Sequence, residues 1–594
     1  MMRTFGWIQN PGRLDTLKNV VAIFQPSSDA YNELICTRLP LLKRNGLISK
    51  TNYDEFMTVL QQRPLKIDYK LLKGKGSSRN RKNAKCTGII QSVVDAQKSV
   101  DLIDLNGNSI KVKKPYTDDW TADGFLRWAI STGLLIYDNN SDTCCISLLG
   151  KELVRAEIDS PSEKEAYETA LLSYPPVNRV LEILSDMLPH TKFEIGRNLG
   201  FCGEKGFTSI PQGQFLAHLE STSDPAVKKS VRSNMEGDAD KYARMIANWC
   251  VKMGWVKSTT KNVIDRFGNS LYSSKLQAWT ITVSGLAALR KSRGNSSNSK
   301  IPKNVFFEML ATKAPDAIYL RHRRATLIMY LSQKRSLKSI RKHMLDCGYD
   351  VDISTILDDL KGFSNIGLSV ENVHDTYHIT DNVVNLIVPE ETVTNSNVNE
   401  LKDKVRSRLK TLDHRYLILI DLAYSDASTK SKKNADAREF ELETVSLFTD
   451  ELEFDGLHLG DSDKPDSIIT YAHNGTIIDN KSYKNGFNVD RHCADEMMRY
   501  IMQNNRREDG IPSNEWWKLF GDNITSFSYL FVTSFLRGRF EDNLSELSKI
   551  THVNGGAIGV DNLLYLAEDL KTGVLSYEDF YAKMQNCELI CIER

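Results

Sequence analysis

The stretch ADGFLRWAISTGLL at residues 122–135 has a counterpart further along the chain, ADKYARMIANWCVKMGWV at residues 239–256. Both begin with Ala-Asp ahead of a helical pattern, and both place an arginine (Arg127 or Arg244) four residues after the aspartate. Each helical pattern ends in a glycine followed by apolar residues, which is typical of a helix that leads into a strand. The repetition predicts two copies of one helix-then-strand unit.

Each copy continues through polar turn residues into a second strand, a short turn and a further helix, at residues 145–157 and 279–292. A fainter third copy occupies residues 354–370 and precedes a strand-like run at residues 377–381. Helix, hairpin and closing helix is the element order of a winged helix, which sets one helix in the major groove of DNA. Three unrelated helix–hairpin units remain an alternative, but the matched Asp–Arg–Gly spacing favours DNA-binding modules.

The composition limits which classes of protein the chain can belong to. The 594 residues, 41% hydrophobic and 26% charged, suit a globular chain of several domains. No apolar run has the length of a membrane span, and the first residues lack the apolar stretch of a signal peptide, so we expect a cytoplasmic protein. The ten cysteines form no CxxC pair and are expected to be reduced thiols.

The net charge of +1 is unevenly distributed. Residues 1–100 hold 17 Lys and Arg against 7 Asp and Glu, a balance of +10, whereas residues 401–594 hold 24 against 33, a balance of −9. A basic N-terminal region suits a module that binds phosphate. An acidic C-terminal region suits a domain that must not bind DNA by itself. Chance variation among solvated surfaces is the alternative.

Three shorter segments complete the organisation. Residues 73–86, KGKGSSRNRKNAKC, form a basic loop that either lies against DNA or is merely solvated. Two β-like runs around Asn106-Gly107 predict a hairpin over residues 100–114. Residues 388–400 are polar, lack helical periodicity and are predicted to be a linker.

Carboxylates gather in the C-terminal region. FELETVSLF at residues 440–448 is helical and carries Glu441, and a strand beginning at Pro465-Asp466 follows. After a short turn, TIIDNKSY places Asp479 and Lys481 two residues apart, hence on one face of a second strand. A hairpin brings Asp466 beside them. Two carboxylates on adjacent strands suit Mg²⁺, which can stabilise charge on a phosphate, and a neighbouring lysine can orient the attacking water.

Longer motifs extend from one end of the chain to the other, among them RTFGWIQNPG at residues 3–12, SYPPVNR, NEWWK and NGGAIGVDNLL at residues 554–564. With them the chain resembles the FokI family of type IIS restriction endonucleases. The resemblance implies an α+β multidomain fold: winged-helix DNA-binding subdomains followed by a PD-(D/E)XK nuclease domain, a mixed β-sheet flanked by helices. The expected divisions are two recognition subdomains at 1–160 and 161–299, a third subdomain at 300–387, the linker at 388–400 and the cleavage domain at 401–594.

The resemblance also implies an activity and its partners. We expect Mg²⁺-dependent cleavage of both DNA strands at a fixed distance from an asymmetric site, with GGATG as the expected site and Mn²⁺ as a possible substitute ion. Double-stranded DNA, a transient homodimer of cleavage domains and a separate cognate DNA methyltransferase are the implied partners, in a bacterial cytoplasm and without a membrane.

Site residues are carried over by position. Asp466, Asp479 and Lys481 match the family's catalytic residues, and the first two would hold the metal. Glu441 is the helix glutamate expected to face it, with Glu439 and Glu443 as alternatives. The positions that match DNA-contacting residues are Asn10, Arg79 or Arg81, Gln97, Trp120, Glu236, Lys241 and Arg244.

Two further residues, Asp495 and Arg499, match the helix that pairs two cleavage domains. A surface salt bridge between Asp495 and Arg499 is the alternative interpretation, as is a pair between Asp240 and Arg244 on the recognition helix.

Some positions depart from the family pattern. Asp461 and Asp463 stand where small or basic residues are expected, and Ser467 stands where glycine is expected, so cut distance and site can differ. Two other classes of function remain open: a strand-specific nicking enzyme or subunit, and a winged-helix regulator with an inactive nuclease domain.

Overall fold

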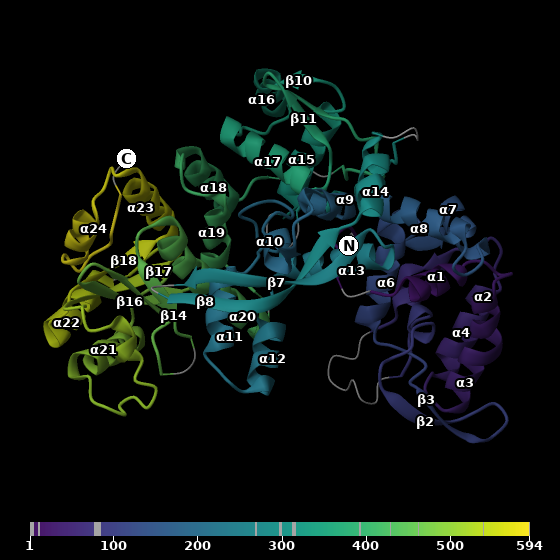
Figure 1. Cartoon of the computed structure of the whole chain (residues 1–594), viewed down its shortest axis with the longest axis horizontal. Coiled ribbons are helices and arrows are strands. Elements are labelled where there is room, and N and C mark those ends of the chain that lie inside the picture. The colour runs from purple at the N-terminus through teal and green to yellow at the C-terminus, as the bar shows by residue number, and fades with distance from the viewer. Residues whose placement is uncertain are drawn as a thin grey trace.

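The computed structural model describes residues 5–9, 12–75, 85–267, 270–295, 300–311, 317–390, 394–427, 429–460, 463–538 and 540–592. In Figure 1 the N-terminal elements lie on the right and the C-terminal elements on the left of an elongated molecule. Most buried apolar side chains from Phe5 to Ile379 pack into one large core with two small satellite clusters, whereas residues 405–590 form two clusters of their own. We call residues up to 387 the recognition region and residues from 401 the cleavage region, after the roles that the family resemblance leads us to expect.

The first helix–hairpin–helix unit folds as predicted. Its elements are α6 (Asp119–Ser131), β4 (Leu135–Asp138), β5 (Thr143–Ile146) and α7 (Leu148–Arg155). The Asp118 side chain caps the start of α6, and after its end Gly133 adopts a φ of +73°, which a residue without Cβ reaches without strain. Residues of α1 (Leu14–Ala22) pack against α6 and α7 in the same core.

The second unit repeats that order with longer strands. It consists of α13 (Asp238–Lys252), β7 (Val256–Phe267), β8 (Ser270–Ile281) and α14 (Val283–Arg293). The two repeated helices pack together, because Trp128 of α6 stacks on Trp249 of α13 with ring centroids 4.4 Å apart. The β7–β8 hairpin extends from this core toward the cleavage region (Figure 1).

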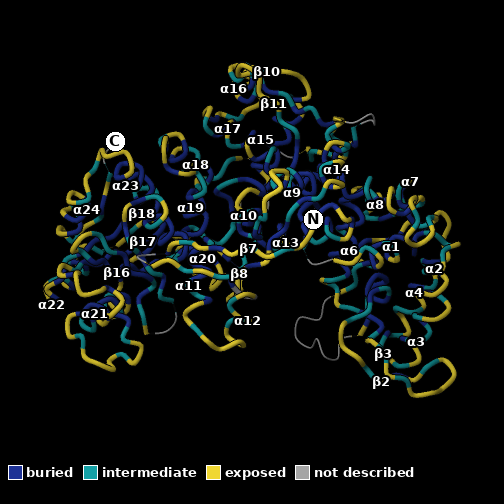
Figure 2. Tube along the Cα trace, in the orientation of Figure 1, coloured by how far each residue is buried: buried dark blue, intermediate teal, exposed yellow. Residues whose placement is uncertain are grey.

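The third copy is only partly a repeat. Helix α17 (Ile353–Ile366) leads into the hairpin of β11 (Val370–Val373) and β12 (Thr376–Ile379). The next described element is not a closing helix but β13 (Val383–Val384), which pairs in parallel with β9 (Lys303–Asn304). The predicted hairpin near residue 100 is present as β2 (Ser99–Ile103) and β3 (Ser109–Lys113), and Figure 2 shows how little of it is buried.

The predicted linker is shorter than its polar sequence suggests. Helix α18 (Asn397–Arg408) begins inside it, so the prediction of irregular chain up to residue 400 is wrong for residues 397–400. The Ser396 side chain accepts a hydrogen bond from the Asn399 backbone amide, which satisfies a free donor of the first helical turn. Of the polar residues that resemble a loop, residues 396–400 are a helix cap and its first turn.

The cleavage region is built on a five-stranded mixed sheet in the order β14-β15-β16-β17-β18. The strands are β14 (Asp455–His458), β15 (Ser467–Tyr471), β16 (Asn474–Lys481), β17 (Ser526–Thr533) and β18 (Gly555–Gly559). The first three pair antiparallel and the last three in parallel.

Helices cover both faces of this sheet, which confirms the predicted fold class. On β16, Ile478 packs in the cluster with α18, α19 (Ile418–Ala423), α20 (Lys430–Ser446), α23 (Val560–Thr572) and α24 (Tyr577–Met584). Its neighbour Ile477 packs in the opposite cluster with α21 (Arg491–Arg506) and α22 (Phe540–Thr551). Because side chains alternate along a strand, residues 479 and 481 belong to the face that α21 covers.

Candidate active site

Asp466, Asp479 and Lys481 come together at one end of the β15–β16 hairpin. Asp466 immediately precedes β15, and Ser467 pairs in register with Ile478, so Asp466 stands beside Asp479. The Asn480 backbone amide donates to Asp466 Oδ2 at 2.6 Å, and Lys481 Nζ lies 2.8 Å from Asp479 Oδ2. The hairpin predicted from the sequence therefore forms and brings the three side chains together; we call this cluster the carboxylate pocket.

Burial determines the electrostatics of this pocket. Asp479 is 3% exposed, and burial raises the pKa of its carboxyl, while the charge of Lys481 opposes the rise. Burial also raises the pKa of Asp466 well above its ordinary range, and the charges of Asp479 and Glu441 raise it further. The carboxyl groups of Asp466, Asp479 and Glu441 thus repel one another when charged, which favours uptake of a proton or binding of a cation between them.

The donor set fits a hard divalent cation that keeps some of its water. Mg²⁺ binds through one or two carboxylates and retains water ligands. Among the described residues, no group of three or more His, Cys, Asp and Glu side chains is arranged as a closed metal cage. The two adjacent aspartates are instead suited to an open site of the kind that nucleotide phosphates enter.

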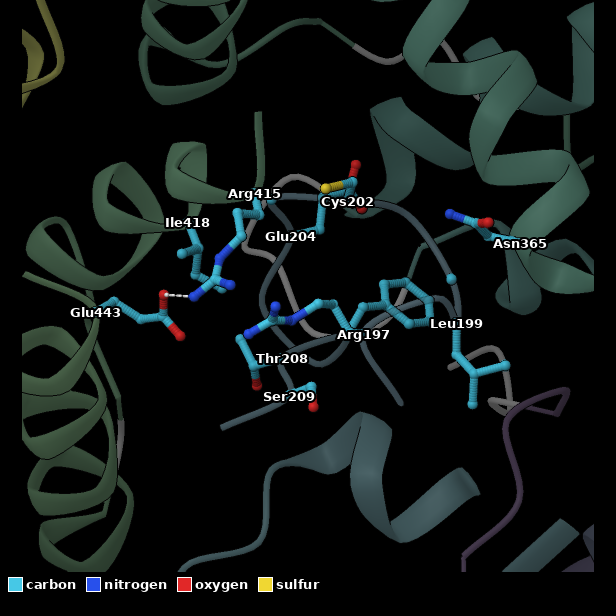
Figure 3. Close-up of a pocket in the computed structure, with 13 residues that line it drawn as sticks. Arg197, Leu199, Cys202, Glu204, Thr208, Ser209, Asn365, Arg415, Ile418 and Glu443 are labelled. Carbon is cyan, nitrogen blue, oxygen red and sulfur yellow. Dashed lines mark hydrogen bonds and ion pairs between the residues drawn. The ribbon is translucent and has the colours of Figure 1, made fainter. Parts of the chain in front are cut away.

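Helix α20 presents Glu441 on one side and Glu439 and Glu443 on the other. Glu441 Oε2 lies 2.9 Å from His458 Nε2, on the side of Asp466. Glu443 accepts a hydrogen bond from Arg415 at 3.4 Å, in the pocket of Figure 3 that recognition-region residues such as Arg197 also line. Glu439 bonds to Thr208 of the recognition region. Residues two apart on a helix point to nearly opposite sides, so Glu441 is the one that faces the carboxylate pocket.

His458 is a site residue that the sequence reasoning missed. Its side chain is 2% exposed and holds the Glu441 carboxylate. The sequence signal is a single histidine at the end of the short run Asp-Gly-Leu-His, and a lone histidine is more typical of a core residue.

The candidate DNA-contacting residues fall into three groups. Asn10, Arg79 and Arg81 lie outside the described residues. Gln97 is exposed, and so is Trp120, in the first turn of α6.

Glu236, Lys241 and Arg244 form the third group. Arg244 Nε lies 2.8 Å from Glu236 Oε1, and Lys241 Nζ lies 3.6 Å from Asp238 Oδ1. The alternative pair between Asp240 and Arg244 is wrong, because the buried Asp240 carboxylate accepts hydrogen bonds from Ser209, Ile210 and Gly237 instead.

The candidate pairing residues Asp495 and Arg499 are exposed on α21. Their side chains do not bond to each other, so the surface salt bridge considered above is not formed. Asp495 lies 4.0 Å from Arg491, and Arg499 lies 3.5 Å from Asp463. Of the two added acids, Asp463 therefore contacts α21, and Asp461 lies outside the described residues.

The cleavage region rests directly on the recognition region. Lys402 donates to the Gly203 carbonyl and to Asp421, each at 2.8 Å, and Lys205 pairs with Asp436. At the far end of the β7–β8 hairpin, Arg266 lies 3.1 Å from Asp455 of β14. Several ion pairs and hydrogen bonds thus hold the cleavage region, which carries the carboxylate pocket, against the recognition region.

Helix–hairpin modules joined to a cleavage sheet with a buried aspartate, a half-buried aspartate and a lysine define a site-specific endonuclease. Comparison with known proteins agrees in every region. Models of the FokI recognition domain match at residues 3–156 (subdomain 1) and 163–288 (subdomain 2), the FokI D3 domain matches at 310–375, and the FokI cleavage domain matches at 395–591. The chain belongs to the FokI family.

Two relatives show how complete the match is. Type II restriction enzyme FokI of Planomicrobium okeanokoites is 37% identical over 602 residues, covering 99% of both chains. Type II restriction enzyme StsI of Streptococcus sanguinis is 29% identical over 586 residues, covering 95% of this chain and 92% of the relative.

Solved structures agree with the sequence comparison. A structure of restriction endonuclease FokI and a structure of FokI bound to DNA match with TM-scores of 0.86 and 0.87, each at 35% identity and with full coverage of both chains. Within the described residues, no helix combines the length and apolar character that crossing a membrane requires.

Proposed function

We propose that this chain is a type IIS restriction endonuclease that binds an asymmetric double-stranded site, GGATG as first expectation, and hydrolyses both strands at a fixed distance from it. The observation that carries the proposal is the pocket of Asp466, Asp479 and Lys481 on a cleavage region that is separate from the recognition core. A cleavage pocket outside the recognition core cuts away from the bound sequence.

In the proposed chemistry, Asp466 and Asp479 hold Mg²⁺, with Mn²⁺ as a possible substitute. When bound, the ion supplies charge stabilisation at the phosphate and makes water more acidic. The Asn480 amide fixes Asp466, and His458 fixes Glu441, so both carboxylates keep their orientation. Lys481 donates hydrogen bonds to the attacking water or to a phosphate oxygen.

In the proposed recognition, Lys241 and Arg244 of α13 read bases in the major groove, where paired guanine acceptors suit basic side chains. Without DNA, Lys241 forms an ion pair with Asp238, and Arg244 forms one with Glu236. Binding of DNA requires these ion pairs to open, so the acids oppose binding to sequences that offer no replacement partner.

Within the part of the chain that the structure describes there is one such pocket, and antiparallel strands require two attacks of opposite polarity. We therefore propose a transient homodimer in which Asp495 of one chain faces Arg499 of the other, since a two-fold axis uses the same surface twice. Bacterial cytoplasm is the proposed location, with a separate DNA methyltransferase specific for the same sequence.

The test is removal of one carboxylate. Asp479→Ala should lose cleavage of site-bearing DNA in Mg²⁺ and keep its binding affinity, because the binding modules lie elsewhere. Asp522→Ala, an exposed residue of the same region, is the matched control and should cut at the parental rate. Cleavage by Asp479→Ala near the parental rate would show that the pocket is not the active site.

A further inference from the structure

Lys481 has a second acidic partner that the family-based assignment does not include. Its ammonium lies 2.8 Å from Asp479 and 3.5 Å from Oε2 of Glu496, and these are its ion pairs among the described residues. Glu496 lies on α21, which covers the sheet face to which residues 477, 479 and 481 belong. The contact thus joins a strand residue of the pocket to a helix that packs over it.

The other carboxylate oxygen of Glu496 accepts a hydrogen bond that fixes the side chain. Tyr500, one helical turn further along α21, donates from its hydroxyl to Glu496 Oε1 at 3.3 Å. Tyr500 is 4% exposed and packs edge-on against the fully buried Trp516, so its ring is fixed in the core. Glu496 therefore reaches Lys481 from an anchored position, although the glutamate itself is 30% exposed.

A lysine needs such an anchor, because its four-carbon stem carries about 2 kcal/mol of rotamer entropy and its ammonium imposes no fixed direction. Asp479 alone is a poor anchor, since the proposed function gives the same carboxylate to the metal. Glu496 has no such competing role in the pocket.

We infer that Glu496 is a positioning residue: it holds Lys481 in the direction of the reacting phosphate and connects this lysine to helix α21. The connection continues along the helix, because Arg499 Nη2 lies 3.8 Å from Glu496 Oε1 and 3.5 Å from the Tyr500 hydroxyl. A second copy of the chain that engages Arg499 therefore acts on a residue that touches the anchor of Lys481. The inference rests on the proposed function of the pocket.

The test separates positioning from pairing. Glu496→Gln keeps the size and the acceptor for Tyr500 but removes the charge, and Glu496→Asp keeps the charge. Single-turnover cleavage is measured against enzyme concentration, which gives a plateau rate and a half-saturating concentration. Glu496→Gln should lower the plateau rate about 10- to 100-fold, as loss of a supporting partner does at other sites. Glu496→Asp should recover part of that loss.

Controls identify which claim fails. The exposed Glu546→Gln should match the parent, and DNA affinity should be unchanged in all variants. A shift of the half-saturating concentration with a parental plateau would mean that Glu496 serves pairing only, which overturns the inference. Equal loss in the Gln and Asp variants, with a lowered unfolding temperature, would reduce it to a packing residue. If Lys481→Ala itself cuts at the parental rate, the proposed active site fails rather than the inference alone.

Discussion

Replacing Glu439 by glutamine should strengthen the contact between the cleavage and recognition regions above neutral pH. Glu439 projects from α20 into the pocket between the regions and bonds to Thr208. Burial raises the pKa of its carboxyl to about 7, and the negative charges of Glu443, Asp238 and Asp436 act in the same direction. The cationic side chains that line the same pocket are Lys205, Lys241, Lys432 and Arg438.

The size of the effect follows from that pKa. The pKa rises from 4.5 to about 7, and at about 1.4 kcal/mol for each tenfold change in proton affinity this gives at most about 3.5 kcal/mol. Because the folded pKa is raised, the docked state binds the extra proton. The stabilisation of the docked state by this proton is therefore complete below pH 4.5 and declines as the pH rises toward 7. Above pH 7 it is lost, and the docked state keeps its lower stability. Glutamine keeps the acceptor for Thr208 and removes this loss.

Amide hydrogen exchange of α20, corrected for intrinsic exchange rates, measures the opening of this contact. In the parent and in Glu546→Gln, protection should fall between pH 5 and pH 7.5 by about 50-fold, the equivalent of about 2.3 kcal/mol. In Glu439→Gln it should stay nearly level and exceed that of the parent at pH 7.5. Parallel curves for the parent and Glu439→Gln would refute the reasoning, because the carboxyl would then titrate alike in both states.

Three other perturbations test separate parts of the account. A fragment of residues 1–388 should bind the site alone with steep salt dependence, whereas 401–594 should cut poorly and without sequence preference; specific cutting by the latter, in an end-mapping assay, would contradict this. Arg244→Ala should weaken binding by about 1–3 kcal/mol and relax specificity at one or two base pairs, whereas uniform weakening across a site library would make it a phosphate contact. Asp495→Arg and Arg499→Asp should each lose double-strand cutting and regain it when mixed; full activity of either alone at low enzyme concentration would exclude this helix as the interface.

Local sequence patterns predicted the pocket and the repeats because their geometry is local. Asp479 and Lys481 share a strand face by their spacing alone, and a short turn brings Asp466 next to them. The repeated helices end at glycines and continue into hairpins, and both features are encoded within a few residues.

Side-chain partners could not be predicted in the same way, because they depend on packing between distant segments. Arg244 pairs with Glu236, which precedes the helix, rather than with Asp240, one turn away, because Asp240 is buried and used as a cap. His458 meets Glu441 across 17 residues, and Glu496 meets Lys481 across 15. None of these pairs follows from helical or strand periodicity.

The most direct measurement maps every end produced when the chain cuts a DNA library in Mg²⁺. The account predicts ends on both strands at constant offsets to one side of a single asymmetric sequence, and no cutting in chelator or by Asp479→Ala. Ends without a common neighbouring sequence, nicks confined to one strand, or cutting that persists in Asp479→Ala would contradict it.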